Sequence, residues 1–334
     1  MWKPIHLVPA NTRIDFMRWH RFTFILAVVM TLASVGLLFT KGLNFGIDFA
    51  GGILMEVRSP QPPDLTDMRE HLSGLGIGEV SLQSFGDPNT VLIRLPQQAG
   101  GEQGQTDATS KVRTALGESW EYRRTETVGP KVGAELVKNA VLAAGLAMAG
   151  IFVYVWIRYA WQFGMNALLA MIHDVVTTLG LFSLLGWQFD LATVAAILTV
   201  AGYSVNDKVV VFDRIRFEMR RYKTMSMTDI VNLSVNETLS RTTVTAGLTL
   251  LSVIALFLFG GEVLRGFAFT MLVGVVTGTY STVFIASSVA VLIGEREAVT
   301  TAKTPAKSTV AATTTAPKTA AKPAANKDAA RKRA

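Results

Sequence analysis

The residues best placed to do chemistry lie in residues 191–216, a long stretch that is mainly apolar. Asp207 falls inside the apolar part of this stretch, because the four residues after Lys208 are again apolar. As a helix, the run from Leu191 to Phe212 is about 33 Å long, enough to cross the hydrocarbon core of a bilayer. An ionisable side chain inside a membrane helix is costly unless it is paired or hydrated. Asp207 is therefore a candidate functional residue.

Helical spacing predicts the surroundings of Asp207. Residues three and four apart share a face, so Tyr203, Ser204 and Asp207 are expected to point the same way as a supporting polar face. Asn206 and Gly202 lie on the adjacent stripe, where Gly202 would allow close approach of another helix. A structural ion pair or polar contact is one interpretation of Asp207. We favour a carboxylate that takes up and releases protons, since acids inside membranes mark ion and proton pathways.

Two other sites join Asp207 as candidates for a proton relay. Arg241 precedes the apolar run 242–259, and we expect it at a depth similar to that of Asp207, where the two side chains could pair. A neighbouring arginine favours the ionised carboxylate and burial favours the neutral one, so their balance allows titration near neutral pH.

The second site is the pair His173 and Asp174, within the apolar run 163–185. Adjacent helical residues point about 100° apart, so each side chain could instead form a separate hydrogen bond to a neighbouring helix. Lys208 is expected off the face of Asp207, with its stem reaching toward the inner membrane surface.

The composition indicates a membrane protein with no enzymatic site. The chain has 334 residues, of which 50% are hydrophobic and only 17% charged. It has no cysteine, and its four histidines are scattered, so we expect no disulfide, metal site or cofactor. We find no nucleophile with a base, and no nucleotide-binding loop. The net charge of +7 equals that of residues 298–334 alone, with eight basic residues and one acid, so it predicts no specific nucleic-acid surface on the folded part.

The order of segments predicts a membrane all-α bundle of six transmembrane helices with an inserted α+β (ferredoxin-like) periplasmic domain. The inserted domain is predicted from the order strand-helix-strand-strand-helix-strand in residues 53–130, with a flexible loop at 100–104 and an outer loop at 260–266 between the last two membrane helices. The expected parts are a cytoplasmic N-terminus (1–21), the first membrane helix (22–39), the periplasmic domain with its flanks (40–135), the bundle of helices two to six (136–293) with a cytoplasmic amphipathic segment (213–240), and a disordered basic cytoplasmic tail (294–334).

Charge asymmetry predicts the orientation of this multi-pass protein. Basic residues precede the first apolar run and follow the fourth, whereas the connection 186–190 has no Lys or Arg, so both termini are expected in the cytoplasm. The first run could be a signal peptide, but no small-residue cleavage site follows it. The tail could attract anionic lipid or ribosomal RNA, or be solvated without a dedicated partner.

Three motifs resemble the SecF family of bacterial protein translocase subunits, within the resistance-nodulation-division superfamily. They are GYSVNDKVVVFDRIR (202–216), FGIDFAGG (45–52) and the segment 260–286, which contains a G-x-x-x-G at Gly274 and Gly278; a His-Asp pair like 173–174 also occurs in such sequences. The resemblance covers about residues 15–293. It implies a structural role at the base of the outer domain for the motif residues Gly46, Asp48, Gly51 and Gly52. Lys208 departs from it, since the family usually has a small polar residue there.

The resemblance implies a non-enzymatic subunit in the bacterial cytoplasmic (inner) membrane. Such a subunit works with SecD and the SecYEG channel, and by family resemblance with YajC and YidC. It uses the proton-motive force to complete preprotein export after the ATP-driven steps of SecA, so its partners include preproteins, protons and membrane lipids. One alternative is an efflux or lipid transporter of the same superfamily, against which the single six-helix half and the small outer domain argue. A passive scaffold with a structural acid is the other.

Overall fold

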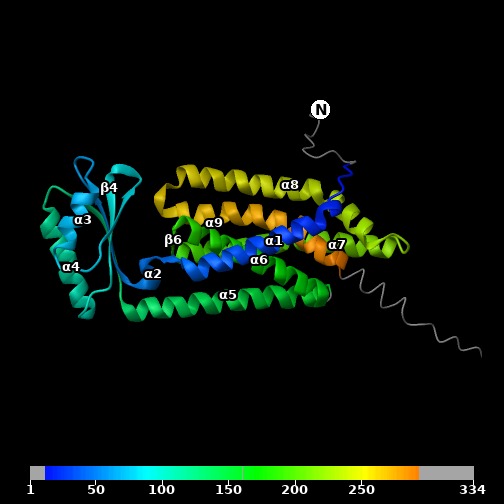
Figure 1. Ribbon diagram of the computed structural model, residues 1–334, viewed down its shortest axis with the longest axis horizontal. Coiled ribbons are helices and arrows are strands. Elements are labelled where there is room, and N and C mark those ends of the chain that lie inside the picture. Colours follow the sequence, from blue (N-terminus) through cyan, green and yellow to red (C-terminus); the bar gives the residue numbers. More distant parts are fainter. Residues whose placement is uncertain (1–11, 160, 293–334) are drawn as a thin grey trace, which may run out of the picture.

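The computed structural model describes residues 12–159 and 161–292 as a long helical bundle with a small α+β domain at one end (Figure 1). Within these residues, six helices are long and apolar enough to cross a membrane, which confirms the predicted fold class. They are α1 (His20–Thr40), α5 (Pro130–Arg158), α6 (Trp161–Leu185), α7 (Leu191–Arg221), α8 (Met227–Phe259) and α9 (Gly261–Tyr280), the last continued by the π-helix η2 (Ser281–Ala286).

The α+β domain has the predicted order of elements. It comprises β2 (Gly52–Arg58), α3 (Leu65–Ser73), β3 (Ser81–Phe85), β4 (Asp87–Leu95), α4 (Gly101–Leu116) and β5 (Glu121–Val128). The antiparallel sheet has the order β3-β4-β2-β5, so its two central strands are the first and third of the domain, as in a ferredoxin-like unit. Alternate residues of the strands, such as Ile53, Met55 and Ile93, are fully buried with Leu72 and Val112 of the two helices.

Local sequence signals predict the start of α3 correctly but not the start of α4. Asp64 caps α3 by accepting a hydrogen bond from the Thr66 backbone N–H at 2.7 Å, and this bond and a second one from Asp67 hold the pKa of Asp64 below its usual value. The predicted flexible loop at 100–104 is wrong. Gly100 has a φ of 97°, and the helix α4 begins directly after it at Gly101.

Several helices extend beyond the expected bounds. α5 begins at Pro130, well before its apolar run, and α9 begins at Gly261, so the predicted outer loop 260–266 is almost entirely helical. The segment 213–240 is not a separate element, because residues 213–221 continue α7 and residues 227–240 open α8. Packing explains these longer helices, because Ile215 and Glu218 of the α7 extension are fully buried. Arg214 forms ion pairs with Glu218 of α7 and with Glu237 of α8.

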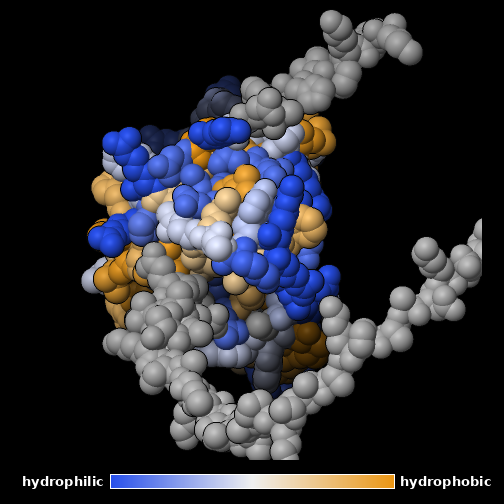
Figure 2. Space-filling model, turned by 90° about the vertical axis from the view of Figure 1, so that its right-hand side faces the viewer, coloured by the Kyte–Doolittle hydropathy of each residue, from blue (hydrophilic) through white to orange (hydrophobic). Residues whose placement is uncertain are grey.

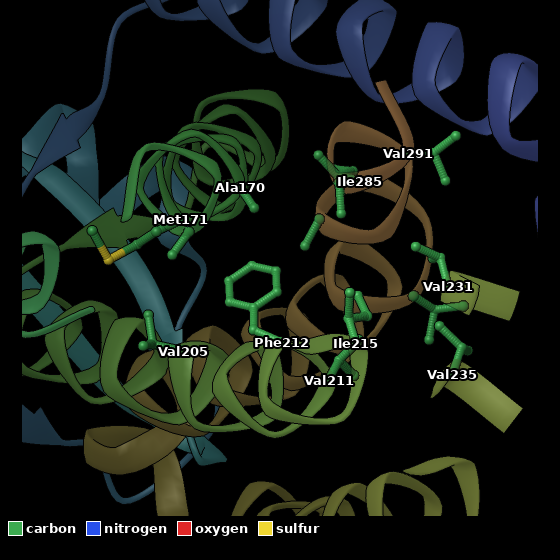
Figure 3. Close-up of a cluster of buried hydrophobic side chains, with 14 of the residues drawn as sticks. Ala170, Met171, Val205, Val211, Phe212, Ile215, Val231, Val235, Ile285 and Val291 are labelled. Carbon is green, nitrogen blue, oxygen red and sulfur yellow. The ribbon is translucent and has the colours of Figure 1, made fainter. Parts of the chain in front are cut away.

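Two apolar clusters and close helix crossings hold the bundle together. Phe212 of α7 points toward Ala170 and Met171 of α6 and lies near Ile285 of η2, as Figure 3 shows. A Cβ atom at Gly274 of α9 would lie 2.3 Å from the Val200 side chain of α7, and one at Gly278 would lie 2.9 Å from Ser204 Oγ. This confirms the close packing predicted from the G-x-x-x-G, whereas a Cβ atom at Gly202 would meet no atom of the described residues within 4 Å, so none of their helices packs closely there.

The end of the bundle farthest from the α+β domain is polar. In Figure 2 this end is largely hydrophilic and is flanked by hydrophobic sides. The segment before α1 is held there, because the Asn236 side chain bonds the backbone N–H and carbonyl of Ile14, both at 2.8 Å, and Asn232 accepts from the Phe16 N–H. The basic tail, 294–334, lies outside the described residues.

Candidate functional site

The polar residues of α7 divide into two faces rather than forming one. Ser204 and Lys208 point toward α6 and α9, where both bond Asp174 of α6. Tyr203 and Asp207 point toward α8, where Thr245 is a close neighbour of both. The expectation that Tyr203, Ser204 and Asp207 share one face is therefore wrong. Residues four apart stay in register with each other, and the two faces meet different neighbouring helices.

Asp174 is the centre of the first polar group, and only 1% of its surface is exposed. Its Oδ2 lies 2.7 Å from Ser204 Oγ, 3.0 Å from Lys208 Nζ and 2.8 Å from Ser281 Oγ. Lys208 Nζ also contacts Ser204 Oγ. The structure thus brings together residues of three helices through one carboxyl oxygen, and an ionised carboxylate suits so many donors.

His173 and Lys208 both differ from the expectations for them. His173 Nδ1 lies 3.1 Å from Asp174 Oδ1, so the two adjacent residues do share one site. Lys208 does not reach the membrane surface, since its side chain is fully buried and bonds Asp174. In the sequence, only the spacing of four residues between Ser204 and Lys208 indicated that these two side chains share a face. Nothing in the sequence indicated that Ser281 would contact the same carboxylate.

Asp207 is the second buried acid, with 3% of its surface exposed. Its Oδ2 is buried and makes no hydrogen bond of normal geometry in the described part of the chain, although Thr245 lies near it; the Tyr203 hydroxyl is likewise buried without such a bond, with Thr249 and Thr245 near it. Arg241 of α8 is exposed and close enough for its charge to act on Asp207. The two form no ion pair within 4.0 Å, in contrast to the pairing considered from the sequence. Among the described residues, then, Asp207 is a buried acid without a fixed counter-ion.

Asn206 lies on a third face of α7, which the described residues leave exposed. It is exposed together with Gly202, Thr199 and Ala195, at intervals of three and four residues. These positions follow one stripe along the helix and carry small or short polar side chains. Such residues are typical of surfaces where one membrane helix packs closely on another.

The motif at residues 45–52 joins the α+β domain to the bundle. The Asp48 carboxylate accepts a hydrogen bond from the Leu191 N–H at the start of α7, at 3.0 Å, and the Gly46 N–H donates to Phe189 O at 2.8 Å. The short strands β1 (Asn44–Phe45) and β6 (Gln188–Phe189) pair beside it, and the short helix α2 (Ile47–Ala50) follows.

The two consecutive glycines that end this motif have positive φ angles. Gly51 has φ 71°, and Gly52 has φ 117° at the start of β2, where a Cβ atom would lie 2.3 Å from Leu95 O. Only glycine fits such a position without strain.

No group of three or more His, Cys, Asp or Glu side chains that could hold a metal ion occurs in the part of the chain that the structure describes. The side chains of the two polar groups offer carboxyl, amine, imidazole and hydroxyl groups. Such groups can exchange protons and hydrogen bonds, and the buried Asp207 carboxyl is best placed to change its protonation.

Two family models match the sequence. The model described as "Protein export membrane protein SecD/SecF, C-terminal" matches residues 108–296, and "SecD/SecF GG Motif" matches residues 36–62. The first covers the five helices after the α+β domain with both polar groups. The second covers the motif that joins the domain to the bundle.

Relatives of similar length carry the same description. The chain is 41% identical over 298 residues to "Protein translocase subunit SecF" of Rickettsia bellii, covering 88% of this chain and 98% of that one. It is 45% identical over 305 residues to the protein of that name from Rhodobacter capsulatus, covering 87% and 92%. The crystal structure of SecDF, a translocon-associated membrane protein from Thermus thermophilus, superposes with a TM-score of 0.79 at 34% identity over 88% of this chain. This chain spans only 40% of the length of that SecDF chain.

Proposed function

The chain belongs to the SecF family of protein translocase subunits, and we propose from this that it acts with SecD and the SecYEG channel to complete preprotein export. In this proposal it uses the proton-motive force after the ATP-driven steps of SecA, without being an enzyme itself. YajC and YidC are further proposed partners. Its ligands are preproteins and protons, and membrane lipids surround it.

The observation that carries the proposal is the state of Asp207. It is 3% exposed in the middle of a membrane bundle, and its Oδ2 lacks a hydrogen-bond partner among the described residues. A carboxylate that only stabilised packing would be expected to have its oxygens bonded, as those of Asp174 are. An unsatisfied buried carboxyl next to the charge of Arg241 can instead gain and lose a proton. We assign Asp207 as the proton carrier and Arg241 as the residue that stabilises its ionised form.

One face of α7, which the described residues leave exposed, supports the need for a second subunit. The stripe of Ala195, Thr199, Gly202 and Asn206 is exposed beside the buried Asp207, where lipid would meet a polar side chain. A second bundle packed on this stripe would cover Asn206 and complete the surroundings of Asp207. SecD is the proposed owner of that bundle, and the 40% span of the SecDF chain agrees with one half of such an assembly.

Placement in the bacterial inner membrane, with both termini in the cytoplasm, is part of the same proposal. The polar end of the bundle in Figure 2 carries basic residues of the α5–α6 and α7–α8 ends, among them Arg158, Arg216, Arg220 and Arg221. Cytoplasmic ends of membrane helices are enriched in such residues. The α+β domain at the opposite end would then lie in the periplasm.

The proposal is tested by late-stage export in cells depleted of both subunits. This chain is supplied alone, together with SecD, or not at all, and the release of mature preprotein outside the cytoplasmic membrane is measured with and without an uncoupler. We expect stimulated export only when both subunits are present, and its loss when the uncoupler collapses the gradient. Full stimulation by this chain alone, or stimulation that the uncoupler leaves unchanged, would contradict the proposal.

A further inference from the structure

Lys208 is the buried lysine of the polar group around Asp174. Its side chain is fully buried, and its ammonium lies 3.0 Å from Asp174 Oδ2 and in contact with Ser204 Oγ. A buried ammonium must be compensated by a nearby negative charge or lose its proton. Asp174 is the only acid that forms an ion pair with Lys208 in the described residues.

The contacts of Asp174 are those of an ionised carboxylate. Its Oδ2 accepts from the Ser204 and Ser281 hydroxyls as well as from Lys208, and His173 Nδ1 is near its Oδ1. Protonation would break this arrangement, because a protonated carboxyl loses its attraction for the ammonium and leaves it unpaired.

The same contacts fasten three helices together. Asp174 comes from α6, Ser204 and Lys208 from α7, and Ser281 opens the π-helix η2 at the end of α9. The π-helix is held from α6 as well, since Asn166 Nδ2 donates to Ala286 O at 2.7 Å. Asp207 stands outside this network and faces α8.

We propose that Lys208 is a positioning residue, a built-in counter-ion that keeps Asp174 ionised and thereby removes Asp174 from the proton pathway. Asp174 then holds α6, α7 and α9 as one unit, and Asp207 is left as the carboxyl that changes protonation, against α8. This inference rests on the proposed function and assigns different roles to its two buried acids. It also assigns His173 to the support of Asp174 rather than to proton transfer.

Charged and titratable groups near the two acids act from several helices. His173 and Lys208 are in contact with Asp174, and the Tyr280 ring of α9 lies 6.4 Å from the His173 ring. Arg241 and Lys208 act on Asp207 by their charges, and Tyr203 lies on the same face of α7. Of the two acids, only Asp174 has a cation within bonding distance among the described residues, so the two should differ in the pH at which they accept a proton.

Carbodiimide labelling distinguishes the two acids in the unaltered protein. Dicyclohexylcarbodiimide adds to protonated carboxyl groups in apolar surroundings, and mass spectrometry of peptides locates the adduct. In membrane vesicles that contain the full complex, we expect Asp207 to be labelled increasingly as pH falls and Asp174 to remain unlabelled. Labelling of Asp174 over the same pH range as Asp207 would overturn the inference.

The counter-ion role is tested by Lys208→Met and by the double variant Asp174→Asn/Lys208→Met. The single change should raise labelling of Asp174 by about tenfold or more, because the carboxyl has lost its paired charge, and it should add a second step to the pH profile of gradient-stimulated export. The double change removes both charges, so the profile should return to the wild-type midpoint. Unchanged labelling in the single variant, or a displaced midpoint in the double variant, would refute the proposal. If Asp207 is never labelled, the proposed function fails instead, whatever the result for Asp174.

Discussion

The crossing of α7 and α9 offers a sharp test of the packing that supports the site. Replacement of Gly274 by alanine would put a Cβ atom 2.3 Å from both Cγ atoms of Val200, where ordinary contacts begin at 3.4 Å. The two helices must therefore separate by about 1 Å, since a helix backbone cannot yield locally and a buried valine has little freedom. Two turns further, Ser281 Oγ lies 2.8 Å from Asp174 Oδ2 of α6, and a shift of about 1 Å away from α6 would stretch that bond beyond the 3.5 Å limit of a hydrogen bond.

The expected loss of stability can be isolated with Gly202→Ala as the matched control. Alanine favours a helix over glycine by up to about 1 kcal/mol at either position, so this gain cancels in the comparison. A Cβ atom at Gly202 of α7 would meet no atom of the described residues within 4 Å, so only Gly274→Ala should overpack. We expect Gly274→Ala to have a free energy of unfolding about 1–3 kcal/mol below that of Gly202→Ala.

The assay is chemical unfolding of the purified protein in detergent, followed by tryptophan fluorescence. Trp187 is a suitable reporter, because its ring packs on Phe269 of α9 with a centroid distance of 4.3 Å. Adding Val200→Ala to Gly274→Ala removes the two closest clashing atoms but leaves the Cβ of residue 200 at 2.8 Å, so it should restore only part of the loss. If Gly274→Ala is as stable as Gly202→Ala to within about 0.5 kcal/mol, the close crossing is not as described and the reasoning fails.

Two further predictions concern the α+β domain. Gly52→Ala should destabilise the start of β2 by about 1–3 kcal/mol, because φ at 52 is 117° and the new Cβ would meet Leu95 O. Limited proteolysis should therefore cleave the domain faster in Gly52→Ala than in Gly36→Ala, whose Cβ meets nothing within 4 Å. Equal rates of cleavage would contradict this prediction. For orientation, a cysteine at Ser84 should react with an impermeant thiol reagent in cells with a permeabilised outer membrane, and one at Ser308, outside the described residues, should not; the reverse pattern would exclude the proposed topology.

Much of the fold follows from local signals in the sequence. The apolar runs predict the six long helices, since a helix is the structure that satisfies its own backbone in a membrane. The order strand-helix-strand-strand-helix-strand in residues 53–130 predicts the elements of the α+β domain. Apolar length fails to predict where α7 ends, because the helix continues past Phe212 on an amphipathic stretch that is held by Ile215 and Glu218 rather than by the membrane.

The site was only partly predictable for a different reason. Sequence spacing places Tyr203, Ser204, Asp207 and Lys208 on α7, but it does not say which helix lies against each stripe. The pairing of Lys208 with Asp174, 34 residues apart, depends on the crossing of α6 and α7. Likewise Asp207 and Arg241 are neighbours, as their expected depths suggested, but the orientation of α8 leaves them without an ion pair.

The central claim, that Asp207 carries protons, is tested most directly by Asp207→Asn in gradient-stimulated export. The amide keeps the size of the side chain and removes the titrating proton. Late-stage preprotein export is measured in vesicles with and without a proton gradient, at equal abundance of the assembled complex. The account predicts that Asp207→Asn assembles normally and loses the stimulation by the gradient, and that Arg241→Met, which removes the charge acting on Asp207, loses most of it. Full gradient-stimulated export by Asp207→Asn would contradict the account and leave Asp207 as a structural residue.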